Sequence, residues 1–583
     1  MRFRSLPGRC SSLFGLGALL VTALSGCAGE GSDSAPVAGA AGFAGSGGSA
    51  MGGYPQGGSS TAGGASAGTG SHAGGGGGAT SGSGGAASGG GAGAGSAGSG
   101  GSVPIPPLDE SLRERARASM VPLVAWYSAQ TGLWNETDWW TSANQLETVI
   151  DYSRETGDPT YADLIDNTFV KNQAGNFDHF GFYDDDGWFA IAWIKAYDLT
   201  HQKKYLDMAK TIFQRMVGGW DDKCGGGIYW ASAKAGNEGL KNKNAIPNSL
   251  FMQTAALLHQ RTPGDGGPGS YLDWAEREWA WFQSKGMLRD DGLVVDGLNN
   301  LTDCKASGPV FTYNNGVLMG ALVDLGTIKN DASMLQLAQK MATATMTKMV
   351  DAEGTLKETP CGGDICTQFK GVFMRNLLRL YRARPTPEAK AFMKHQSDQL
   401  WDANRSDQDQ YGYEWHLPFD KGTASRQSSA IDALLAASGS SQPNLGLQAT
   451  ATGSAPCADS ALAYAFDGGS RAGSKWCAAG AGGQTLTADL GAARSIVGFR
   501  VRHAGAGGEE KAWNTRDYEL EVSVDGQVYA SAVAVRDNTN DVTTHPIAPT
   551  TARYVRLHVT SAQTATEFLA ARIYELEIFG TEP

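Results

Sequence analysis

The pattern of apolar and polar positions divides the chain into three stretches. From Pro104 to about Ser438, apolar residues recur with the spacing of amphipathic helices. After Asn444, short segments alternate between apolar and polar residues, which is typical of strands with one buried face. Residues 28–102 lack Leu, Ile, Trp, Lys and Arg and are mostly Gly, Ala and Ser, so they cannot bury enough apolar surface to fold. The sequence thus predicts a tether, a helical domain and a β domain.

The helical stretch contains segments for twelve helices, each bounded by polar or turn-forming residues. They are expected at roughly 109–129, 138–156, 158–172, 186–199, 202–217, 246–261, 270–285, 313–328, 331–349, 367–382, 386–404 and 425–437.

The connections between these segments alternate in length. Short polar turns such as Thr200-His201 and Lys329-Asn330 close helix hairpins, whereas longer loops rich in Gly and aromatic residues separate one hairpin from the next. Six hairpins with all long loops at one end predict an (α/α)6 barrel whose loops gather at one mouth. A helical solenoid is the alternative, but its repeats would resemble one another more in sequence.

The β domain is expected to be an antiparallel all-β sandwich. Its strands are predicted near 484–489, 497–503, 518–524, 554–560 and 574–579, with turn signals such as Asp525-Gly526 between them. The predicted domains are a helical domain at 104–438, a linker at 439–443 and the β domain at 444–583.

The N-terminus has the features of an export signal. Arg2 and Arg4 precede a short apolar run, Leu13 to Leu24, and Leu24-Ser25-Gly26-Cys27 resembles a bacterial lipobox. This resemblance implies a signal peptide at 1–26, a lipid on Cys27 and a tether at 27–103. The expected location is the outer membrane or cell surface, and an ordinary cleaved signal is the alternative.

The charge and the cysteines limit the possible partners. A net charge of −12 without a Lys/Arg-rich block argues against nucleic acid. Export would place the remaining six cysteines in an oxidising space, where an even number favours disulfides. Proximity pairs Cys361 with Cys366 and Cys457 with Cys477, leaving Cys224 and Cys304. Zinc is the competing interpretation, but the spacings match no standard finger.

The candidate catalytic centre is Asp184-Asp185-Asp186, which stands before an aromatic, apolar helical run. Two neighbouring carboxylates are sufficient for glycoside hydrolysis, and their repulsion should raise one pKa so that one acid stays protonated. Tyr and Trp residues in the loops could stack on sugar rings. The alternative is that the acids only cap a helix N-terminus.

The motif Tyr183-Asp184-Asp185-Asp186-Gly187-Trp188 resembles the signature of glycoside hydrolase family 76, the endo-α-1,6-mannanases. Further motifs match in the same order: Gly226-Gly227-Ile228-Tyr229-Trp230, Lys243-Asn244-Ala245-Ile246, Tyr313-Asn314-Asn315-Gly316, Phe369-Lys370-Gly371 and Gln427-Ser428-Ser429-Ala430.

The resemblance implies an (α/α)6 fold and retaining hydrolysis of internal α-1,6-mannosidic bonds of mannan, with no catalytic cofactor. It places the nucleophile at Asp184 and the acid/base at Asp185. The side chains that it implies for mannose binding are Tyr183, Trp188, Tyr229, Trp230, Asn244, Tyr313, Asn314 and Asn315. Asp186 falls where the family varies, and Phe189 stands where a second Trp is common.

Residues 444–582 resemble the discoidin or coagulation-factor type C domain, which is also carbohydrate-binding module family 32. The resemblance is carried by motifs such as Ala465-Phe466-Asp467-Gly468 and Arg553-Tyr554-Val555-Arg556-Leu557. It implies glycan binding and a structural calcium with Asp467 and Glu577 as candidate ligands.

Two other functions remain open from the sequence: another (α/α)6 enzyme, such as a different glycosidase, an epimerase or a lyase, and a glycan-binding lipoprotein without activity. Epimerases of this fold use barrel histidines, and the nine histidines of the chain do not group in the predicted mouth loops. The chain is expected to be a monomer.

Overall fold

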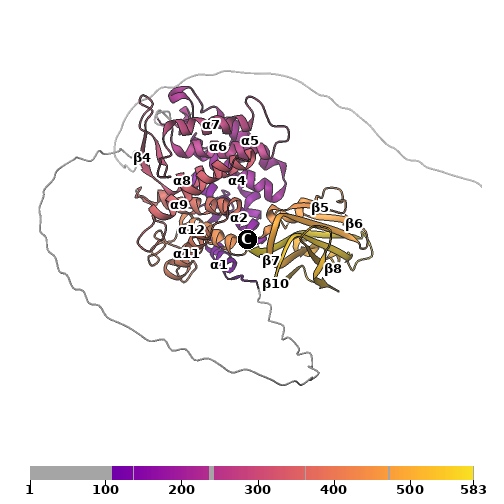
Figure 1. Cartoon of the computed structure of the whole chain (residues 1–583). Coiled ribbons are helices and arrows are strands. Elements are labelled where there is room, and N and C mark those ends of the chain that lie inside the picture. The colour runs from indigo at the N-terminus through magenta and orange to yellow at the C-terminus, as the bar shows by residue number, and fades with distance from the viewer. Residues whose placement is uncertain (1–107, 136, 236–241, 362, 471–472, 582–583) are drawn as a thin grey trace, which may run out of the picture. The chain divides into compact units, whose positions relative to one another are not determined.

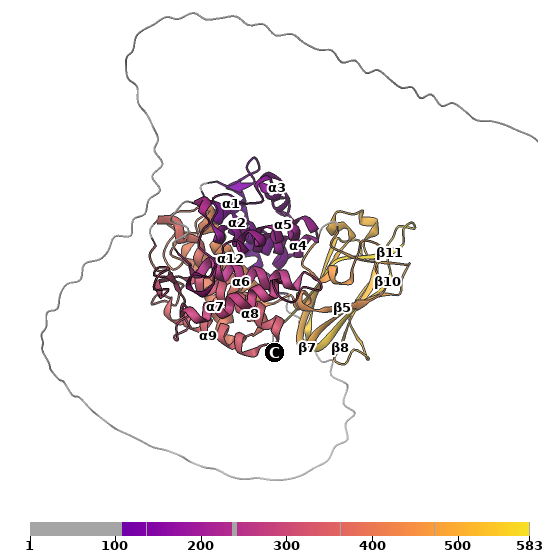
Figure 2. The ribbon, with the colours of Figure 1, turned by 90° about the horizontal axis from the view of Figure 1, so that it is seen from above.

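The computed structural model describes residues 108–135, 137–235, 242–361, 363–470 and 473–581, which belong to one compact unit. Helices occupy the first part of this region and an antiparallel sheet the last part (Figures 1 and 2). The predicted signal peptide, Cys27 and the tether lie outside the described residues. Among the described helices, none combines the length and the apolar composition that crossing a membrane requires.

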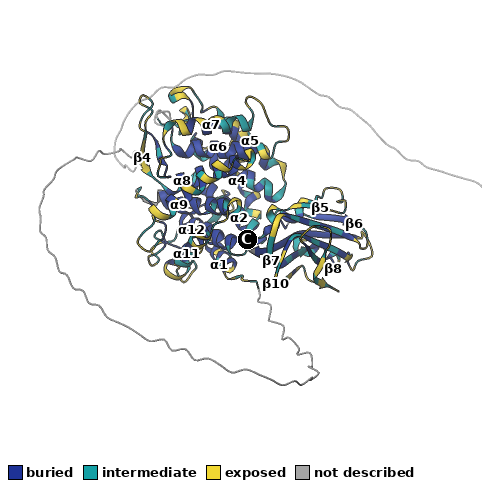
Figure 3. Cartoon of the chain, viewed as in Figure 1, coloured by how far each residue is buried: buried dark blue, intermediate teal, exposed yellow. Residues whose placement is uncertain are grey.

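Six helices form an inner ring, and their largely buried surfaces appear dark blue in Figure 3. Each contacts the next in chain order, and the last contacts the first, which closes the ring. These inner helices are α2 (Trp139–Thr156), α4 (Tyr183–Thr200), α6 (Ala245–Gln260), α8 (Thr312–Lys329), α10 (Phe369–Ala383) and α12 (Ala424–Ser441).

Six outer helices alternate with the inner ones along the chain: α1 (Ser111–Ala125), α3 (Asp163–Asn172), α5 (Lys203–Val217), α7 (Tyr271–Lys285), α9 (Ala332–Lys348) and α11 (Pro387–Gln399). Helices α3, α5, α7 and α9 each pack on the inner helix that precedes them in the chain. Helices α11 and α1 both pack on α12. This arrangement confirms the predicted (α/α)6 barrel.

The longest connections lead from an outer helix to the N-terminus of an inner helix, whereas the α6–α7 connection at 261–270, of intermediate length, lies at the other end. The loops therefore gather at the end of the barrel where the inner helices begin. Short hairpins sit in two of them: β1 (Tyr127–Ser128) pairs with β2 (Leu133–Trp134), and β3 (Val295–Leu298) pairs with β4 (Ala306–Val310). This end is the mouth of the barrel.

Several boundaries differ from those expected. Helix α1 ends at Ala125 and α3 begins at Asp163, four and five residues inside the expected limits of 129 and 158. Helix α4 begins at Tyr183, three residues earlier than predicted, so the acidic run forms its first turn.

Helix α12 continues to Ser441, so the first part of the predicted linker is helical. Gly439 and Ser440 are buried because α12 still packs on α10 here, and a Cβ on Gly439 would stand 3.0 Å from the Leu378 side chain.

The second domain is all-β and antiparallel, as predicted, but the expected strands 484–489 and 497–503 form one continuous strand. Its strands are β5 (Thr450–Gly453), β6 (Trp476–Ala479), β7 (Gln484–His503), β8 (Asp517–Ser523), β9 (Ala530–Val535), β10 (Val542–Ser561) and β11 (Ala570–Thr581). The strand order is β6-β11-β7-β10-β8-β9, and β5 also pairs with β7. Register shifts in β10 at Pro546/Thr550 and Ala552/Tyr554 show that the long β7–β10 ladder is interrupted by bulges.

Candidate active site

The acidic run begins helix α4 at the mouth of the barrel. Phe182 is the N-cap residue, has an extended backbone, and forms an isolated β-bridge with Ala231. The backbone N–H of Tyr183 donates to the carbonyl of Trp230 at 2.9 Å. No side chain caps the helix. The loop that carries Trp230 therefore sets where α4 starts, and the acids have a role other than side-chain capping.

Asp184 is held from two sides. The indole Nε1 of Trp230 donates to its Oδ2 at 3.0 Å, and the backbone N–H of Asp185 donates to its Oδ1 at 3.2 Å. Burial raises the pKa of Asp184 to about 7, although these hydrogen bonds act in the opposite direction. The carboxyl group is therefore oriented and ionises near neutral pH.

Asp185 has a different environment. Among the described residues, no side chain donates a hydrogen bond to its carboxyl group, and the charged groups that influence its pKa are other carboxylates, which repel it. Burial and the charges of Asp184, Asp186 and Asp138 raise its pKa well above 3.8. Because Asp184 has hydrogen-bond donors and Asp185 has none, the pair titrates with Asp184 losing its proton first. One acid is thus anionic while its neighbour stays protonated.

Asp186 is engaged elsewhere. Arg215 on α5 donates from Nε to its Oδ2 at 2.9 Å and from Nη2 to its Oδ1 at 2.6 Å, a two-point ion pair. Burial raises the pKa of Asp186 to about 6 in spite of this pair. Asp186 therefore links α4 to α5 through this ion pair, which gives it a structural role distinct from that of Asp184 and Asp185.

Two of the predicted sugar-binding aromatic residues are packed inside the barrel. Trp188 is 3% exposed and Tyr183 is 7% exposed. The Trp188 ring lies 6.2 Å from that of Trp140 and beneath the guanidinium of Arg375, at 5.8 Å. A Cβ on Gly219 would stand 2.7 Å from the Tyr183 ring. Neither ring offers an open face to a sugar in this structure, contrary to the expectation.

Tyr229 and Trp230 lie half-exposed in the loop between α5 and α6. The Tyr229 hydroxyl donates to Oδ2 of Asp221 at 2.6 Å, and Lys243 lies 4.8 Å from the centre of its ring. Lys243 is buried and donates from Nζ to Oδ1 of Asp221 at 2.6 Å and to the carbonyl of Gly226 at 2.8 Å. This lysine fixes the loop that presents Trp230 to Asp184.

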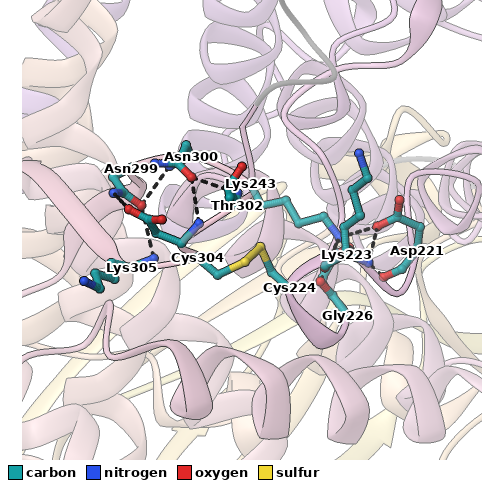
Figure 4. The surroundings of a disulfide bond; sticks show 12 residues. Asp221, Lys223, Cys224, Gly226, Lys243, Asn299, Asn300, Thr302, Cys304 and Lys305 are labelled. Atoms are coloured by element: carbon teal, nitrogen blue, oxygen red, sulfur yellow. Dashed lines mark hydrogen bonds and ion pairs between the residues drawn. A yellow bond between two sulfur atoms is a disulfide. The ribbon is translucent and has the colours of Figure 1, made fainter.

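A disulfide between Cys224 and Cys304 ties the same loop to the hairpin before α8 (Figure 4). Asn299 and Asn300 accept backbone hydrogen bonds around Cys304, from Lys305 at 3.1 Å and from Thr302 at 2.8 Å. The structure also pairs Cys361 with Cys366 and Cys457 with Cys477, the two pairs favoured by proximity, and Cys224–Cys304 is the pair that they leave.

Asp296, on strand β3, organises the predicted amide side chains and was not singled out in the sequence. Asn244 donates to its Oδ2 at 3.2 Å and Asn314 to its Oδ1 at 3.0 Å. The Oδ1 atoms of both asparagines are buried without a hydrogen-bond partner. Burial raises the pKa of Asp296. Two buried acceptors thus have no donor among the described residues.

Asn315 has a different role from its neighbour Asn314. Its Oδ1 accepts from the backbone N–H of Val294 at 3.1 Å, and its Nδ2 donates to the carbonyl of Phe311 at 2.9 Å. Both ends of the amide are therefore used to hold the β3 loop and the start of α8, so Asn315 supports the site instead of facing a substrate.

Tyr313 forms an aromatic wall near the acids. Its ring stacks on Phe369 with centroids 3.7 Å apart, and Phe369 lies 6.0 Å from Trp140. Burial raises the pKa of Tyr313, and the charges of Asp296 and Asp184 act in the same direction. The structure therefore brings Tyr313, Asp296 and Asp184 together from three different segments. A lone Asp between apolar residues, as in Val295-Asp296-Gly297-Leu298, is the only sequence signal for Asp296.

The two residues proposed for calcium are separately engaged. Oδ2 of Asp467 lies 2.6 Å from Nε2 of His201 and accepts from the Ser474 hydroxyl at 2.6 Å. Glu577 forms an ion pair with Arg500 at 3.1 Å. Cationic or donor groups thus occupy these carboxylates in the structure, and calcium binding by them stays a prediction.

The sequence profile of glycosyl hydrolase family 76 matches residues 111–445, more than half of the chain. The chain belongs to this family. A profile of the F5/8 type C domain matches residues 448–573, which shows a discoidin-type domain after the family 76 barrel.

Known relatives agree with this membership. The chain is 25% identical over 263 residues to a mannan endo-1,6-alpha-mannosidase of Eremothecium gossypii, covering 41% of this chain and 57% of that protein. The chain spans about half the length of the curated relatives it matches.

Solved structures show the same fold. An inactive variant of the GH76A alpha-1,6-mannanase of Salegentibacter sp. HEL1_6, in complex with alpha-1,6-mannotriose, superposes with a TM-score of 0.50 and 23% identity. That match covers 56% of this chain and 99% of the other. Dfg5 from Chaetomium thermophilum, in complex with glucosamine, superposes with a TM-score of 0.52 and 18% identity over 57% of this chain and 90% of that one.

Proposed function

We propose that this family 76 enzyme hydrolyses internal α-1,6-mannosidic bonds of mannan with retention of configuration. The observation that carries the proposal is the asymmetry between two consecutive acids at the mouth of the barrel. Trp230 donates to Asp184, while Asp185 has no donor among the described residues, and burial and the neighbouring acids raise its pKa well above 3.8. The inactive Salegentibacter variant has two consecutive aspartates replaced by asparagine, which supports the choice of an adjacent pair.

In the first step, the Asp184 carboxylate attacks the anomeric carbon of a mannose unit, and the protonated Asp185 gives its proton to the departing glycosidic oxygen. This forms a covalent mannosyl-enzyme ester on Asp184. In the second step, the Asp185 carboxylate takes a proton from water, and the water oxygen attacks the same carbon from the opposite face. Two inversions release the product with its original α configuration.

The surrounding residues support these steps. The N-terminal end of α4 carries a partial positive charge that stabilises the anionic carboxylate. The free Oδ1 atoms of Asn244 and Asn314 would accept hydroxyl groups of mannose, and Tyr313 with Trp230 would provide aromatic contacts. Binding through such side chains places the sugar against the pair.

We further propose that the discoidin-type domain binds a glycan and that the chain is exported, with a lipid on Cys27. A binding domain beside a hydrolase raises the effective concentration of an insoluble substrate. The Gly-rich tether would hold the enzyme on the order of 50 Å from the membrane. Radiolabelled palmitate incorporation that is lost in Cys27→Ala tests the anchor, and a glycan array tests the second domain.

The deciding experiment measures hydrolysis of linear α-1,6-mannan by the wild type, Asp184→Asn and Asp185→Asn, with circular dichroism to confirm folding. We expect both variants to lose at least about 1,000-fold in kcat, because each carries a separate role in both steps. NMR should show the α-anomer as the first product. Release of the β-anomer first would contradict retention, and no turnover by the wild type would favour glycan binding without catalysis.

A further inference from the structure

Two loops at the mouth bring together three side chains that the catalytic proposal does not use. Asp351 and Glu353 follow α9, and His416 lies in the loop before α12. One potential ligand atom from each of them falls within 4.8 Å of the others. Within the described residues, these three form the one group of at least three His, Cys, Asp or Glu side chains whose ligand atoms lie this close together.

The local sequence orients Asp351. Its Oδ1 accepts hydrogen bonds from the backbone N–H groups of Glu353 at 3.0 Å and Thr355 at 2.9 Å. Gly354 has a φ of +81°, which closes a tight turn below the bridge between Val350 and Leu356. The turn uses Oδ1 completely and leaves Oδ2 directed at His416.

A separate set of bonds positions His416. Asn404 donates from Nδ2 to the carbonyls of Glu414 at 2.9 Å and Leu417 at 2.8 Å, on both sides of the histidine. The imidazole therefore approaches Asp351 from a loop that Asn404 supports.

Nδ1 of His416 lies 2.7 Å from Oδ2 of Asp351, yet the two atoms do not form a hydrogen bond. Both atoms are buried and neither has a hydrogen-bond partner in the described part of the chain, and the Asp351 side chain is only 8% exposed. The contact has the distance of an ion pair but not the geometry of a hydrogen bond, so a cation that both atoms can ligate would satisfy them better than they satisfy each other.

The His259–Asp265 pair shows what an ordinary contact of this kind looks like. There, Nδ1 and Oδ2 are 2.8 Å apart and form a hydrogen bond. Asp265 also accepts from the backbone N–H groups of Tyr271 and Leu272. The two pairs have nearly the same separation and differ in the hydrogen bond and in the third carboxylate, Glu353.

We propose that Asp351, Glu353 and His416 bind one divalent zinc-type cation that clamps the α9–α10 loop to the α11–α12 loop. Zinc binds imidazole nitrogen and carboxylate oxygen at about 2.0–2.2 Å in tetrahedral geometry, so two ligand atoms on one ion stand roughly 3.3–3.6 Å apart. The contact between His416 and Asp351, now 2.7 Å, would open by less than about 1 Å to take the ion. Calcium prefers six to eight oxygen ligands and takes imidazole poorly. The mixed set of one nitrogen and two carboxylates therefore favours zinc.

The clamp would act on the mouth through Glu358. This residue lies in the same α9–α10 loop, and its carboxylate accepts from the backbone N–H of Thr312 at 3.2 Å, at the first residue of α8. Tyr313 and Asn314 follow directly on α8. A cation at Asp351 would thus hold one wall of the site without touching the reacting atoms.

The test compares the full chain with Asp351→Asn, His416→Gln and Glu353→Gln, with His259→Gln as the matched control. After dialysis against Zn²⁺ and removal of unbound metal, mass spectrometry of the metal content should give one zinc per wild-type and His259→Gln chain. Competition with a chromogenic chelator should show that zinc affinity falls in Asp351→Asn and His416→Gln by more than the roughly 10- to 100-fold that loss of an outer-shell partner costs.

Thermal unfolding provides a second reading, because a ligand that binds only the folded state raises Tm. Zinc should raise the Tm of the wild type and of His259→Gln, and should leave that of His416→Gln unchanged. Wild-type zinc content at background level, or equal zinc affinity in the wild type and His416→Gln, would show that Asp351 and His416 form an ion pair only.

Discussion

The indole Nε1 of Trp230 donates a 3.0 Å hydrogen bond to Oδ2 of Asp184. These residues come from different family 76 motifs, one in the loop before α6 and one in the first turn of α4. The bond gives Asp184 a donor that Asp185 lacks, and it therefore separates two chemically identical neighbours into an anion and an acid.

Replacing Trp230 with Phe should raise the pKa of Asp184 above about 7, because the hydrogen bond that stabilises the carboxylate is lost. A hydrogen bond to a charged group contributes about 1.5–3 kcal/mol, which corresponds to roughly one to two pH units. The acidic limb of the pH profile of kcat should move up by that amount. Trp281→Phe is the control, because its Nε1 donates to the carbonyl of Cys224. An unshifted profile in Trp230→Phe would contradict the assignment of Asp184 as the anion.

Replacing Asp186 with Asn should affect stability far more than catalysis. The change breaks the two-point ion pair with Arg215, which is 23% exposed. We expect the free energy of unfolding to fall by at most about 2 kcal/mol, because the loss of the ion pair is partly offset by removal of a carboxylate whose pKa burial raises to about 6. Urea unfolding measures this loss, and kcat at a temperature where the variant is folded should stay within about fivefold of the wild type. A loss of kcat as large as in Asp184→Asn would place Asp186 among the catalytic residues.

The catalytic pair should make stability depend on pH. The pKa of Asp184 is raised from 3.8 to about 7 in the folded state, so the folded state binds this proton more tightly than the unfolded state does. The free energy of unfolding should therefore fall as pH rises from about 4 to 7, by at most about 4 kcal/mol at 1.36 kcal/mol per pH unit.

The double variant Asp184→Asn/Asp185→Asn lacks this contribution. It should be more stable than the wild type at pH 8 and similar to it at pH 4, as measured by urea unfolding at both values. Equal stability of the two proteins at pH 8 would mean that neither acid is destabilised by burial.

The two amide neighbours on α8 should behave differently. Asn314→Ala removes a free acceptor together with the hydrogen bond that its Nδ2 donates to Asp296, so it should raise KM for α-1,6-mannan oligosaccharides by about tenfold and also lower Tm. Asn315→Ala removes two internal hydrogen bonds and should lower Tm. Steady-state kinetics separate the two variants, and thermal unfolding measures the loss of stability in both. A KM increase confined to Asn315→Ala would reverse these roles.

Loss of the Cys224–Cys304 disulfide should destabilise the barrel. The cysteines are 80 residues apart, so the chain-entropy model gives about 4 kcal/mol. Cys224→Ser/Cys304→Ser should lower Tm and reduce kcat, because the disulfide anchors the loop that carries Trp230. Cys457→Ser/Cys477→Ser is the control in the second domain, and it should keep mannan hydrolysis. Unchanged Tm in the first variant would show that Lys243 alone fixes the loop.

Much of the barrel could be predicted from local patterns. Helical periodicity and alternating connection lengths located all twelve helices, since an inner helix is recognisable from its apolar run and its polar turns. The start of α4 was misplaced because a β-bridge between Phe182 and Ala231, far apart in the chain, decides where that helix begins. The linker between the domains was predicted to begin at residue 439, but α12 continues to Ser441 because Gly439 packs on Leu378.

The sequence by itself determined the motifs, the order of the domains, the cysteine pairs favoured by spacing and the choice of an acidic pair near Trp188. Only the tertiary structure decided how equivalent residues differ. In the structure, Asp186 forms an ion pair with Arg215, and Trp188 is buried. Asn315 uses both ends of its amide in internal hydrogen bonds, whereas Asn314 uses only its Nδ2, which donates to Asp296. These differences depend on which segments meet at the mouth, and residue type carries no record of contacts between distant parts of the chain.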